Sequence, residues 1–587
     1  MKPRELQMIE PKGRFDRRKF NALLAGFGVA GTALPKLLWS EVDSTGGVSK
    51  EALIGAEQIA GLEFTDEERD LMLSGLEELR EDYERLREMT IDNSVSPALL
   101  FDPVLPGMEL PSVPPKRRAS LSKLKTRPAD DSELAYLPVT ELGNLLRIGA
   151  ISSEELTTLY LDRLKRFDSE LHCVITLTEE RAIAQARRAD RELASGIWRG
   201  PLHGVPWGAK DLLAVRGYPT TWGAAPFKDQ VIDDDATVVQ RLDQAGAVLV
   251  AKLTLGALAW GDVWYGEMTR NPWDTEQGSS GSSAGPGSAT AAGLVGFSIG
   301  SETWGSIVSP ATRCGVSGLR PTFGQVSRAG AMALSWSMDK LGPMCRSVED
   351  CALVFEAIHG ADDLDPTAVD HQFVWDSDLD FRKLRVGYLK SAFERELEFD
   401  DEDTEEDRAG AREWHALDLR TLKILESLGV ELIPMELPDL PVGAMSFILS
   451  AEAGAAFDEL TRSGRDDELV RQIDNAWPNV FRQSRTIPAV EYIQANRART
   501  LVMREMERIL DGLDCWVSPS FGGSNLLLTN LTGHPTVVVP NGFRSDGTPT
   551  SVTFNGRLFG EPQILALARA YQEATGFHRR HPEQFAK

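Results

Sequence analysis

Cysteine and histidine are scarce in this chain, and their scarcity limits the chemistry that it supports. Only five cysteines and eight histidines occur among 587 residues. No C-x-x-C pair and no H-E-x-x-H motif is present, so nothing indicates a zinc knuckle, a disulfide framework or a metalloprotease helix. We therefore expect buried free thiols, no metal and no cofactor. A pair between Cys345 and Cys351 is the alternative for two of the thiols.

Positive charge is also in deficit. The chain has 63 lysines and arginines against 88 aspartates and glutamates, which gives a net charge of −25. Nucleic-acid binding requires clustered basic side chains, so we expect no nucleic-acid partner and interpret the acidity as a source of solubility. The acidic run Phe399–Asp407 is interpreted as a solvated loop or helix start, with an interaction patch as the alternative.

The sequence near the N-terminus lacks an apolar run long enough to cross a membrane. The uncharged segment Ala22–Leu34 has 13 residues, whereas a spanning helix needs ~20. Arg17 and Arg18 precede this segment, and the combination is typical of a twin-arginine export signal. We predict a signal over residues 1–40, export to the periplasm and no stable membrane span after signal removal. An amphipathic helix with a basic start is the alternative.

The rest of the chain divides by composition into two parts. Residues 41–133 combine a helical pattern rich in Glu and Arg with a Pro-, Ser- and Lys-rich stretch, which predicts a helical extension and a linker. Residues 134–587 alternate helical patterns with short β-rich runs. This alternation predicts an α/β fold with a largely buried mixed central β-sheet sandwiched between helices. The predicted strands include Ala247–Lys252, Leu384–Leu389, Val430–Pro434 and Cys515–Ser518, and two helices are predicted within residues 139–167.

A serine- and glycine-rich stretch, Gln277–Pro310, contains the residues most suited to nucleophilic chemistry. Gly281–Gly285 fits the G-x-S-x-G nucleophile elbow, which would make Ser283 the nucleophile. That elbow requires a strand before the serine, and "RNPWDTEQGS" immediately upstream predicts a loop instead. No histidine context selects a base for Ser283. We therefore reject the elbow interpretation.

A lysine supplies a different base. Lys210 lies in "GPLHGVPWGAKDL", a Gly- and Pro-rich stretch that predicts an enclosed turn. A lysine removed from water loses its proton more readily, because desolvation disfavours the charged form, and a neutral lysine can act as a general base. A lysine with its headgroup in solvent is the alternative.

The lysine segment and the serine stretch together resemble the amidase signature family, and in particular exported bacterial amidases. The resemblance extends from about residue 137 to 581. Its motifs are the lysine segment itself, Asn271–Asp274, Ala291–Val295, Gly305–Ile307, Pro310–Ala311, Cys314–Val316 and Gly318–Thr322.

The resemblance implies a catalytic mechanism and the residues that carry it. It aligns Ser282 with a bridging serine whose peptide bond is cis, and Ser306, which follows 24 residues later, with the nucleophile. Lys210 is the base of the implied Ser-Ser-Lys triad, which forms an acyl-enzyme without metal or cofactor. Backbone N–H groups of Thr303, Trp304, Gly305 and Ser306 are the implied oxyanion hole.

Departures from the family pattern bear on the substrate. Trp304 replaces a glycine, Val308 occupies the place of an arginine that in some relatives pairs with a substrate carboxylate, and Glu302 replaces an aspartate. Trp207 adds a second large ring before the lysine. We expect Trp207, Trp304 and Val308 to line a pocket for an uncharged, fairly hydrophobic amide, with core packing as the alternative for both tryptophans.

Three functions follow from these observations. The leading hypothesis is an exported amidase that hydrolyses the C–N bond of a small-molecule amide. The first alternative is the amidase subunit of a tRNA-dependent amidotransferase, which channels ammonia to a partner subunit; the second is a non-catalytic binding protein on the same scaffold. The sequence leaves the oligomeric state open, with a homodimer among the options.

Overall fold

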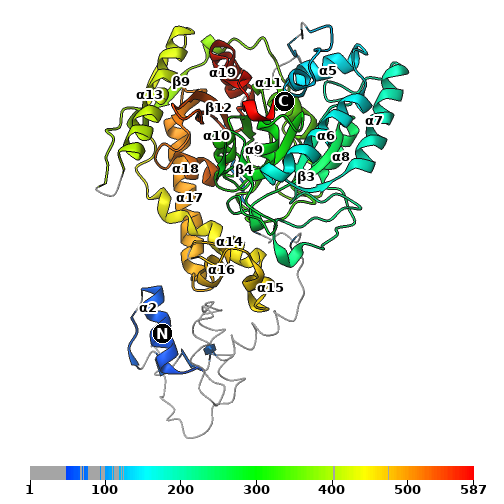
Figure 1. Cartoon of the computed structure of the whole chain (residues 1–587). Coiled ribbons are helices and arrows are strands. Elements are labelled where there is room, and N and C mark those ends of the chain that lie inside the picture. The colour runs from blue at the N-terminus through cyan, green and yellow to red at the C-terminus, as the bar shows by residue number, and fades with distance from the viewer. Residues whose placement is uncertain are drawn as a thin grey trace, which may run out of the picture. The chain divides into compact units, whose positions relative to one another are not determined.

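A computed structural model describes most of the chain. The described residues are 48–61, parts of 63–76, 93, 99–108, 110, 118–120, 122, 124–400, 404–473 and 475–586. The chain divides into two compact units, residues 1–90 with 485–493, and residues 91–484 with 494–587 (Figure 1). The predicted export signal lies outside the described residues.

An eleven-stranded mixed sheet forms the centre of the larger unit, with the strand order β1-β3-β2-β6-β8-β7-β12-β13-β11-β9-β10. Strand β2 pairs in parallel with both β3 and β6. Strands β8, β7, β12 and β13 are antiparallel to each of their neighbours. The strands are β1 (Val174–Leu177), β2 (Pro206–Lys210), β3 (Val248–Leu253), β6 (Phe297–Glu302), β7 (Ser317–Arg320), β8 (Lys340–Cys345), β9 (Val386–Leu389), β10 (Leu432–Met435), β11 (Cys515–Pro519), β12 (Thr536–Phe543) and β13 (Pro549–Gly556).

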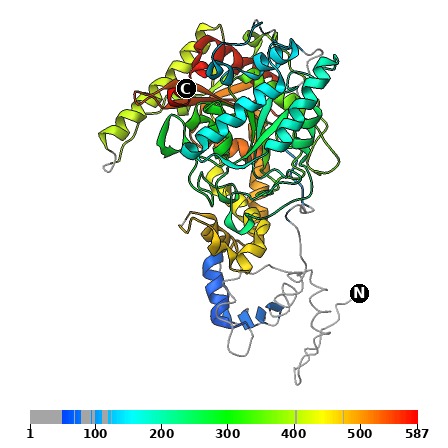
Figure 2. The ribbon, with the colours of Figure 1, turned by 45° about the vertical axis from the view of Figure 1, so that its right-hand side comes forward.

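Helices pack against this sheet along its whole length. Helices α6, α7 and α9 contact the β2–β3 part of the sheet, and α10, α11 and α19 contact the central strands. Helix α13 contacts β10, β12 and β13 (Figures 1 and 2). The helices are α4 (Asp131–Ala135), α5 (Val139–Arg147), α6 (Ser153–Leu171), α7 (Glu179–Ala194), α8 (Thr237–Gln244), α9 (Ala284–Ala291), α10 (Val308–Cys314), α11 (Val348–Ile358), α12 (Lys390–Phe393), α13 (Glu405–Ser427), α14 (Phe447–Ala456), α15 (Asp458–Arg462), α16 (Trp477–Ser484), α17 (Ala489–Ile509), α18 (Asn525–Thr532) and α19 (Glu561–Thr575).

These elements confirm the predicted α/β class with helices flanking a mixed sheet. The four predicted strands correspond to β3, β9, β10 and β11, and the two predicted helices are α5 and α6. Every residue of β3 is buried. A strand that is covered on both faces has a nearly continuous apolar sequence, which is why the sequence predicted this strand. The acidic run before residue 408 leads into α13, where Thr404 and Asp407 form a capping box.

The prediction of a loop at residues 270–279 was wrong. Here Arg270–Asn271 (β4) pairs with Asp274–Gly278 (β5) in a two-stranded hairpin. The Asn271 side chain accepts a hydrogen bond from the Trp273 amide at 3.1 Å, and Trp273 Nε1 donates to the Cys314 carbonyl at 2.8 Å. These bonds fix a tight turn that the polar sequence alone did not indicate.

The smaller unit contains helix α2 (Lys50–Ala60), as the helical pattern predicted. Ser49 caps its N-terminus, and Gly61 ends it in the left-handed conformation at φ +67°. Arg69 donates to Glu57 at 2.9 and 2.8 Å within the same unit.

All five cysteines are buried and free, which confirms the thiol prediction. Within the described residues, no helix combines the length and apolarity that crossing a membrane requires.

Candidate active site

Parallel strands bring the lysine and the serine segment to one edge of the sheet. Strand β2 ends at Lys210 and lies beside β6, which ends at Glu302, and the two strands run parallel. The carboxyl ends of neighbouring parallel strands meet at the same edge, where α/β proteins commonly place their sites. Helix α9, which begins directly after Ser283, packs against both strands.

Lys210 is fully buried and surrounded by serine hydroxyls. Its Nζ lies 2.8 Å from Ser282 Oγ, 3.1 Å from Ser283 Oγ and 2.9 Å from Ser301 Oγ. Burial holds the pKa of Lys210 well below its ordinary value, although the charges of Asp339 and Glu302 act in the opposite direction. The sequence-based expectation of an enclosed lysine is therefore correct.

The hydrogen atoms in this cluster distinguish Ser283 from its neighbours. Ser283 Oγ donates its single hydrogen to the Ser301 carbonyl at 3.0 Å and accepts from the Ser301 amide at 3.1 Å. Ser283 can therefore only accept from Lys210. A neutral amine has two hydrogens and one lone pair, so a hydrogen and the lone pair remain for Ser282 and Ser301. When the amine is neutral, one of these two hydroxyls therefore donates a hydrogen bond to the lysine Nζ.

The segments that carry Ser282 and Ser306 are joined directly. The Ser283 amide donates to the Ser306 carbonyl at 3.1 Å, and the Gly281–Ser282 peptide bond is cis. Ser306 is 8% exposed and Ser282 is 1% exposed. Ser306 therefore keeps limited access to the surface, and its backbone is bound to the residue that follows Ser282.

The turn from Thr303 to Ser306 presents backbone donors. Within the described chain, its four amide N–H groups donate to no backbone or side-chain acceptor, whereas the next two amides donate to Glu302. Gly305 adopts φ +85°, a conformation that favours glycine. N–H groups that are left available on one turn are suited to stabilise an oxyanion.

A buried ion pair anchors this turn. Glu302 Oε2 accepts from the Ile307 and Val308 amides at 2.8 and 2.9 Å, and Arg320 Nη1 lies 2.6 Å from Glu302 Oε1. Burial opposes ionisation of Glu302, yet the Arg320 charge and the Val308 N–H together lower its pKa to about 2. The carboxylate is therefore ionised and holds both ends of the turn.

Two residues that the sequence did not single out complete the site. Ser301 contacts Lys210, and the Asp339 carboxylate accepts from the Thr303 hydroxyl at 2.6 Å. Asp339 also accepts from the Leu334 and Ser335 amides, and burial raises its pKa. No sequence signal marks either residue, because both join the site through strand pairing and a distant loop.

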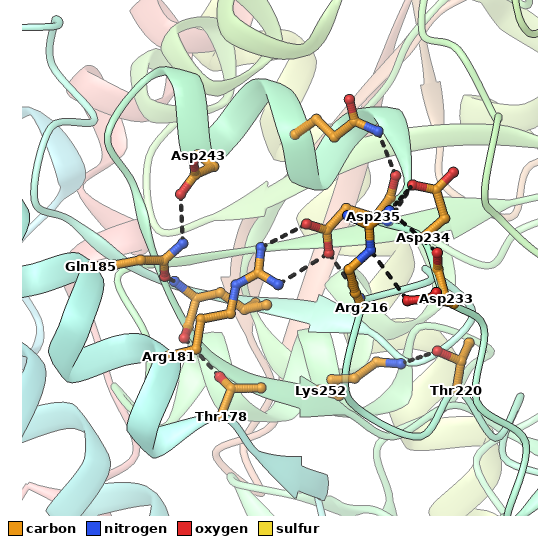
Figure 3. A network of polar contacts seen from close by, with 12 residues as sticks. Thr178, Arg181, Gln185, Arg216, Thr220, Asp233, Asp234, Asp235, Asp243 and Lys252 are labelled. Carbon is orange, nitrogen blue, oxygen red and sulfur yellow. Dashed lines mark hydrogen bonds and ion pairs between the residues drawn. The ribbon is translucent and has the colours of Figure 1, made fainter.

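A second buried ion pair supports the chain after Lys210. Lys252 Nζ lies 2.7 Å from Asp211 Oδ1. It also donates to Thr220 Oγ1 at 2.6 Å (Figure 3). Farther along this loop, Arg181 forms two hydrogen bonds to Asp235 at 3.0 and 3.1 Å (Figure 3). These contacts fix the backbone that follows the lysine.

The three residues expected to line a substrate pocket lie in different environments. Trp207 is 1% exposed and its ring is stacked near Phe297, at a centroid distance of 6.0 Å. Val308 is fully buried in an apolar cluster. Trp304 is 45% exposed. Trp207 and Val308 therefore pack in the core, and Trp304 alone of the three presents its ring to solvent.

Comparisons with known proteins agree with this geometry. A family model described as Amidase matches residues 155–528. A glutamyl-tRNA(Gln) amidotransferase subunit from Moorella thermoacetica is 34% identical over 496 residues, which cover 77% of this chain and 99% of the relative. The structure of peptide amidase from Stenotrophomonas maltophilia is 29% identical, with a TM-score of 0.66 over 76% of this chain and 98% of that chain. The structure of the corresponding glutamyl-tRNA(Gln) amidotransferase subunit from Thermotoga maritima is 26% identical, with a TM-score of 0.61 over 76% and 96%.

Proposed function

The chain belongs to the amidase signature family of C–N bond hydrolases, and we propose that it hydrolyses the carboxamide bond of a small-molecule amide through a serine acyl-enzyme. The proposed nucleophile is Ser306, the proposed bridging residue is Ser282 and the proposed base is Lys210. The observation that carries this proposal is a desolvated lysine 2.8 Å from Ser282 Oγ.

The proposed proton route combines the Lys210–Ser282 hydrogen bond with the mechanism that the family resemblance implies. Ser306 Oγ attacks the amide carbonyl while its proton passes to Ser282, and Ser282 passes its own proton to the lone pair of Lys210. The backbone N–H groups of residues 303–306 receive the developing oxyanion. The proton returns through Ser282 to the leaving amine, and water then hydrolyses the acyl-enzyme.

We further propose an uncharged, fairly hydrophobic substrate. The exposed Trp304 ring stands within the turn that presents the oxyanion donors, so an apolar part of the substrate has a surface to pack on. The residue at the position where some relatives carry an arginine is the buried Val308, which supplies no charge for a substrate carboxylate.

A fluorophosphonate probe with serine-to-alanine variants tests the assignment. We expect the probe to label the wild type, Ser306→Ala to lose labelling, and Ser283→Ala to retain it, since Ser283 only accepts from the lysine. Hydrolysis of aryl, aliphatic and amino-acid amides, with esters alongside, then defines the reaction. Labelling that survives in Ser306→Ala contradicts the assignment, and an unlabelled, folded wild type favours the non-catalytic binding protein.

The named relatives support a second candidate function, that of an amidotransferase component. Relatives such as that of Moorella thermoacetica carry the name of a glutamyl-tRNA(Gln) amidotransferase subunit. Under this alternative, the purified chain would be inactive on simple amides by itself and would gain activity with partner subunits of such an enzyme. Turnover of simple amides by the chain alone favours the amidase.

A further inference from the structure

A cavity of about 310 Å³ lies next to the candidate active site. Ser301 and Thr303 line it, and they contact Lys210 and Asp339 respectively. Leu364, which is 67% exposed, also lines it. The cavity therefore extends from solvent to residues that belong to the proposed active site, and its volume is at the lower end of the range for small-ligand sites.

The walls of the cavity are mostly apolar. Met332 and Leu334 are buried and belong to the segment that leads to Asp339. The Ala333 backbone between them is fixed by two hydrogen bonds with the Asn93 side chain, at 3.0 and 2.8 Å. The apolar lining includes Leu212, Ala259, Met332, Leu334, Leu341 and Leu364. Buried apolar walls on a fixed backbone favour an apolar ligand of limited size.

The charges in the lining disfavour an anionic ligand. Arg328 is the one cation among the described lining residues, and its Nε lies 2.9 Å from Asp365 Oδ2. Its remaining nitrogens donate to the Trp336 carbonyl and the Thr367 hydroxyl. This part of the lining thus leaves no positive charge for a substrate carboxylate, and Asp339 adds a carboxyl group near the catalytic end.

The lining also contains an unused hydrogen-bond donor. Trp336 Nε1 is buried and has no partner within the described structure, and Trp336 lines the cavity. A buried N–H without an acceptor is unfavourable.

We propose that this cavity is the specificity pocket of the enzyme, which receives an uncharged apolar group attached to the scissile amide, and that Met332 and Leu334 limit the size of that group. This inference rests on the proposed function, since it assigns the cavity to the same site. The wild type is then expected to prefer phenylacetamide over acetamide, and to discriminate against succinamate, by at least about 10-fold in kcat/KM.

Variants that change the cavity volume test the inference. Met332→Trp is expected to lower the ratio of kcat/KM for phenylacetamide over acetamide by about 10-fold or more, because the larger ring fills the pocket. Leu334→Ala is expected to shift the preference toward larger groups. Met435→Trp is the matched control: Met435 is similarly buried but lies on β10, at the far edge of the sheet, and the variant should keep the wild-type ratio.

The measurements separate failure of the pocket from failure of the proposed function. A second substrate series that varies the amine instead of the acyl part shows which side of the amide occupies the cavity, and a response in either series supports the pocket. Folded Met332→Trp and Leu334→Ala variants with wild-type ratios in both series overturn it, even if fluorophosphonate still labels Ser306. A wild type that is neither labelled nor active instead overturns the proposed function.

Discussion

The side chain of Lys210 is held by three serine hydroxyls in a place closed to solvent. Because Ser283 has committed its hydrogen to a backbone carbonyl, it stabilises the amine and cannot relay a proton. The second hydrogen and the lone pair of the neutral Lys210 amine remain for Ser282 and Ser301. Proton transfer to Lys210 therefore depends on which of these two hydroxyls donates to Nζ. At the scale of single residues, hydrogen-bond counting thus separates adjacent serines with the same chemistry.

The protonation of Lys210 gives a prediction for the dependence of rate on pH. Only the neutral amine accepts a proton, so kcat/KM is expected to fall as pH decreases through the lysine pKa, about tenfold per pH unit. Since burial lowers that pKa, the acidic limb should lie well below the ordinary lysine value of 10.5. A pH–rate profile measures it, and Lys210→Met should lose at least about 100-fold in kcat/KM.

Lys340→Met is the control for this prediction. Lys340 is also buried with a lowered pKa, but it contacts the Met338 carbonyl and none of the three serines. An acidic limb that moves in Lys340→Met, or activity that persists in Lys210→Met, would contradict the assignment of the base.

At the scale of elements, two ion pairs place the turns that follow β2 and β6. Glu302 ends β6 and holds the 303–308 turn through two amides, while Arg320 on β7 fixes the carboxylate. Asp211 follows β2 and pairs with Lys252 on β3. Each turn is therefore attached to a neighbouring strand, which limits its freedom at the site.

Glu302→Gln is expected to destabilise the fold and impair the site together. Removing one partner of a buried ion pair costs about 3–5 kcal/mol. A glutamine also cannot accept from all four donors that Glu302 serves, which are the Ile307 and Val308 amides, Arg320 Nη1 and Asn530 Nδ2. Denaturant unfolding and the rate of fluorophosphonate labelling measure the two effects. Glu561→Gln is the matched control, because burial raises the pKa of that carboxyl and a neutral side chain should be tolerated. Equal losses in both variants would contradict the anchoring role.

Asp418 in helix α13 gives a stability prediction. Burial raises its pKa to about 7, against a hydrogen bond from Asn541. The folded state then binds more protons than the unfolded state between pH 4 and 7, so this carboxyl lowers stability as pH rises through that window. Asp418→Asn should therefore stabilise the protein by up to about 4 kcal/mol at pH 8 and by much less at pH 4. Thermal unfolding at the two pH values checks this, and a gain independent of pH would contradict it.

At the scale of the whole molecule, the amidase fold bears on the reaction, whereas the N-terminal segment bears on the location of the protein. The fold matches relatives over about three quarters of the chain, whereas Arg17, Arg18 and the apolar segment that follows them lie outside the described residues. We propose that this segment directs export of the folded protein by the twin-arginine route.

Replacing Arg17 and Arg18 by lysines tests export. The exchange keeps the charge but removes the guanidinium pair, so the protein should accumulate in the cytoplasm while its catalytic unit stays active. Cell fractionation with immunodetection measures the distribution. Arg14→Lys, outside the pair, is the control and should leave the distribution unchanged. Export of the double lysine variant would contradict the twin-arginine proposal.

The sequence by itself determined the class of the fold and the alignment of Lys210, Ser282 and Ser306 with a family triad. Apolar periodicity marks strands and helices because it reflects which faces are buried. The alignment rests on the 24-residue spacing between Ser282 and Ser306. The sequence shows this spacing directly, because each serine lies in a short, continuous motif. The hairpin at residues 270–278 escaped prediction because its sequence is polar and because one of the two bonds that hold its turn reaches the distant Cys314 carbonyl.

Only the tertiary structure decided which other residues complete the site. Ser301 and Asp339 contribute through strand pairing and through a loop distant in the sequence, so no local pattern marks them. The tertiary structure also places Trp207 and Val308 in the core and leaves Trp304 exposed. Residue type alone does not predict which of several apolar side chains is buried. The cavity beside Ser301 and Thr303 exists because segments from several elements converge there, and convergence is a property of the folded chain alone.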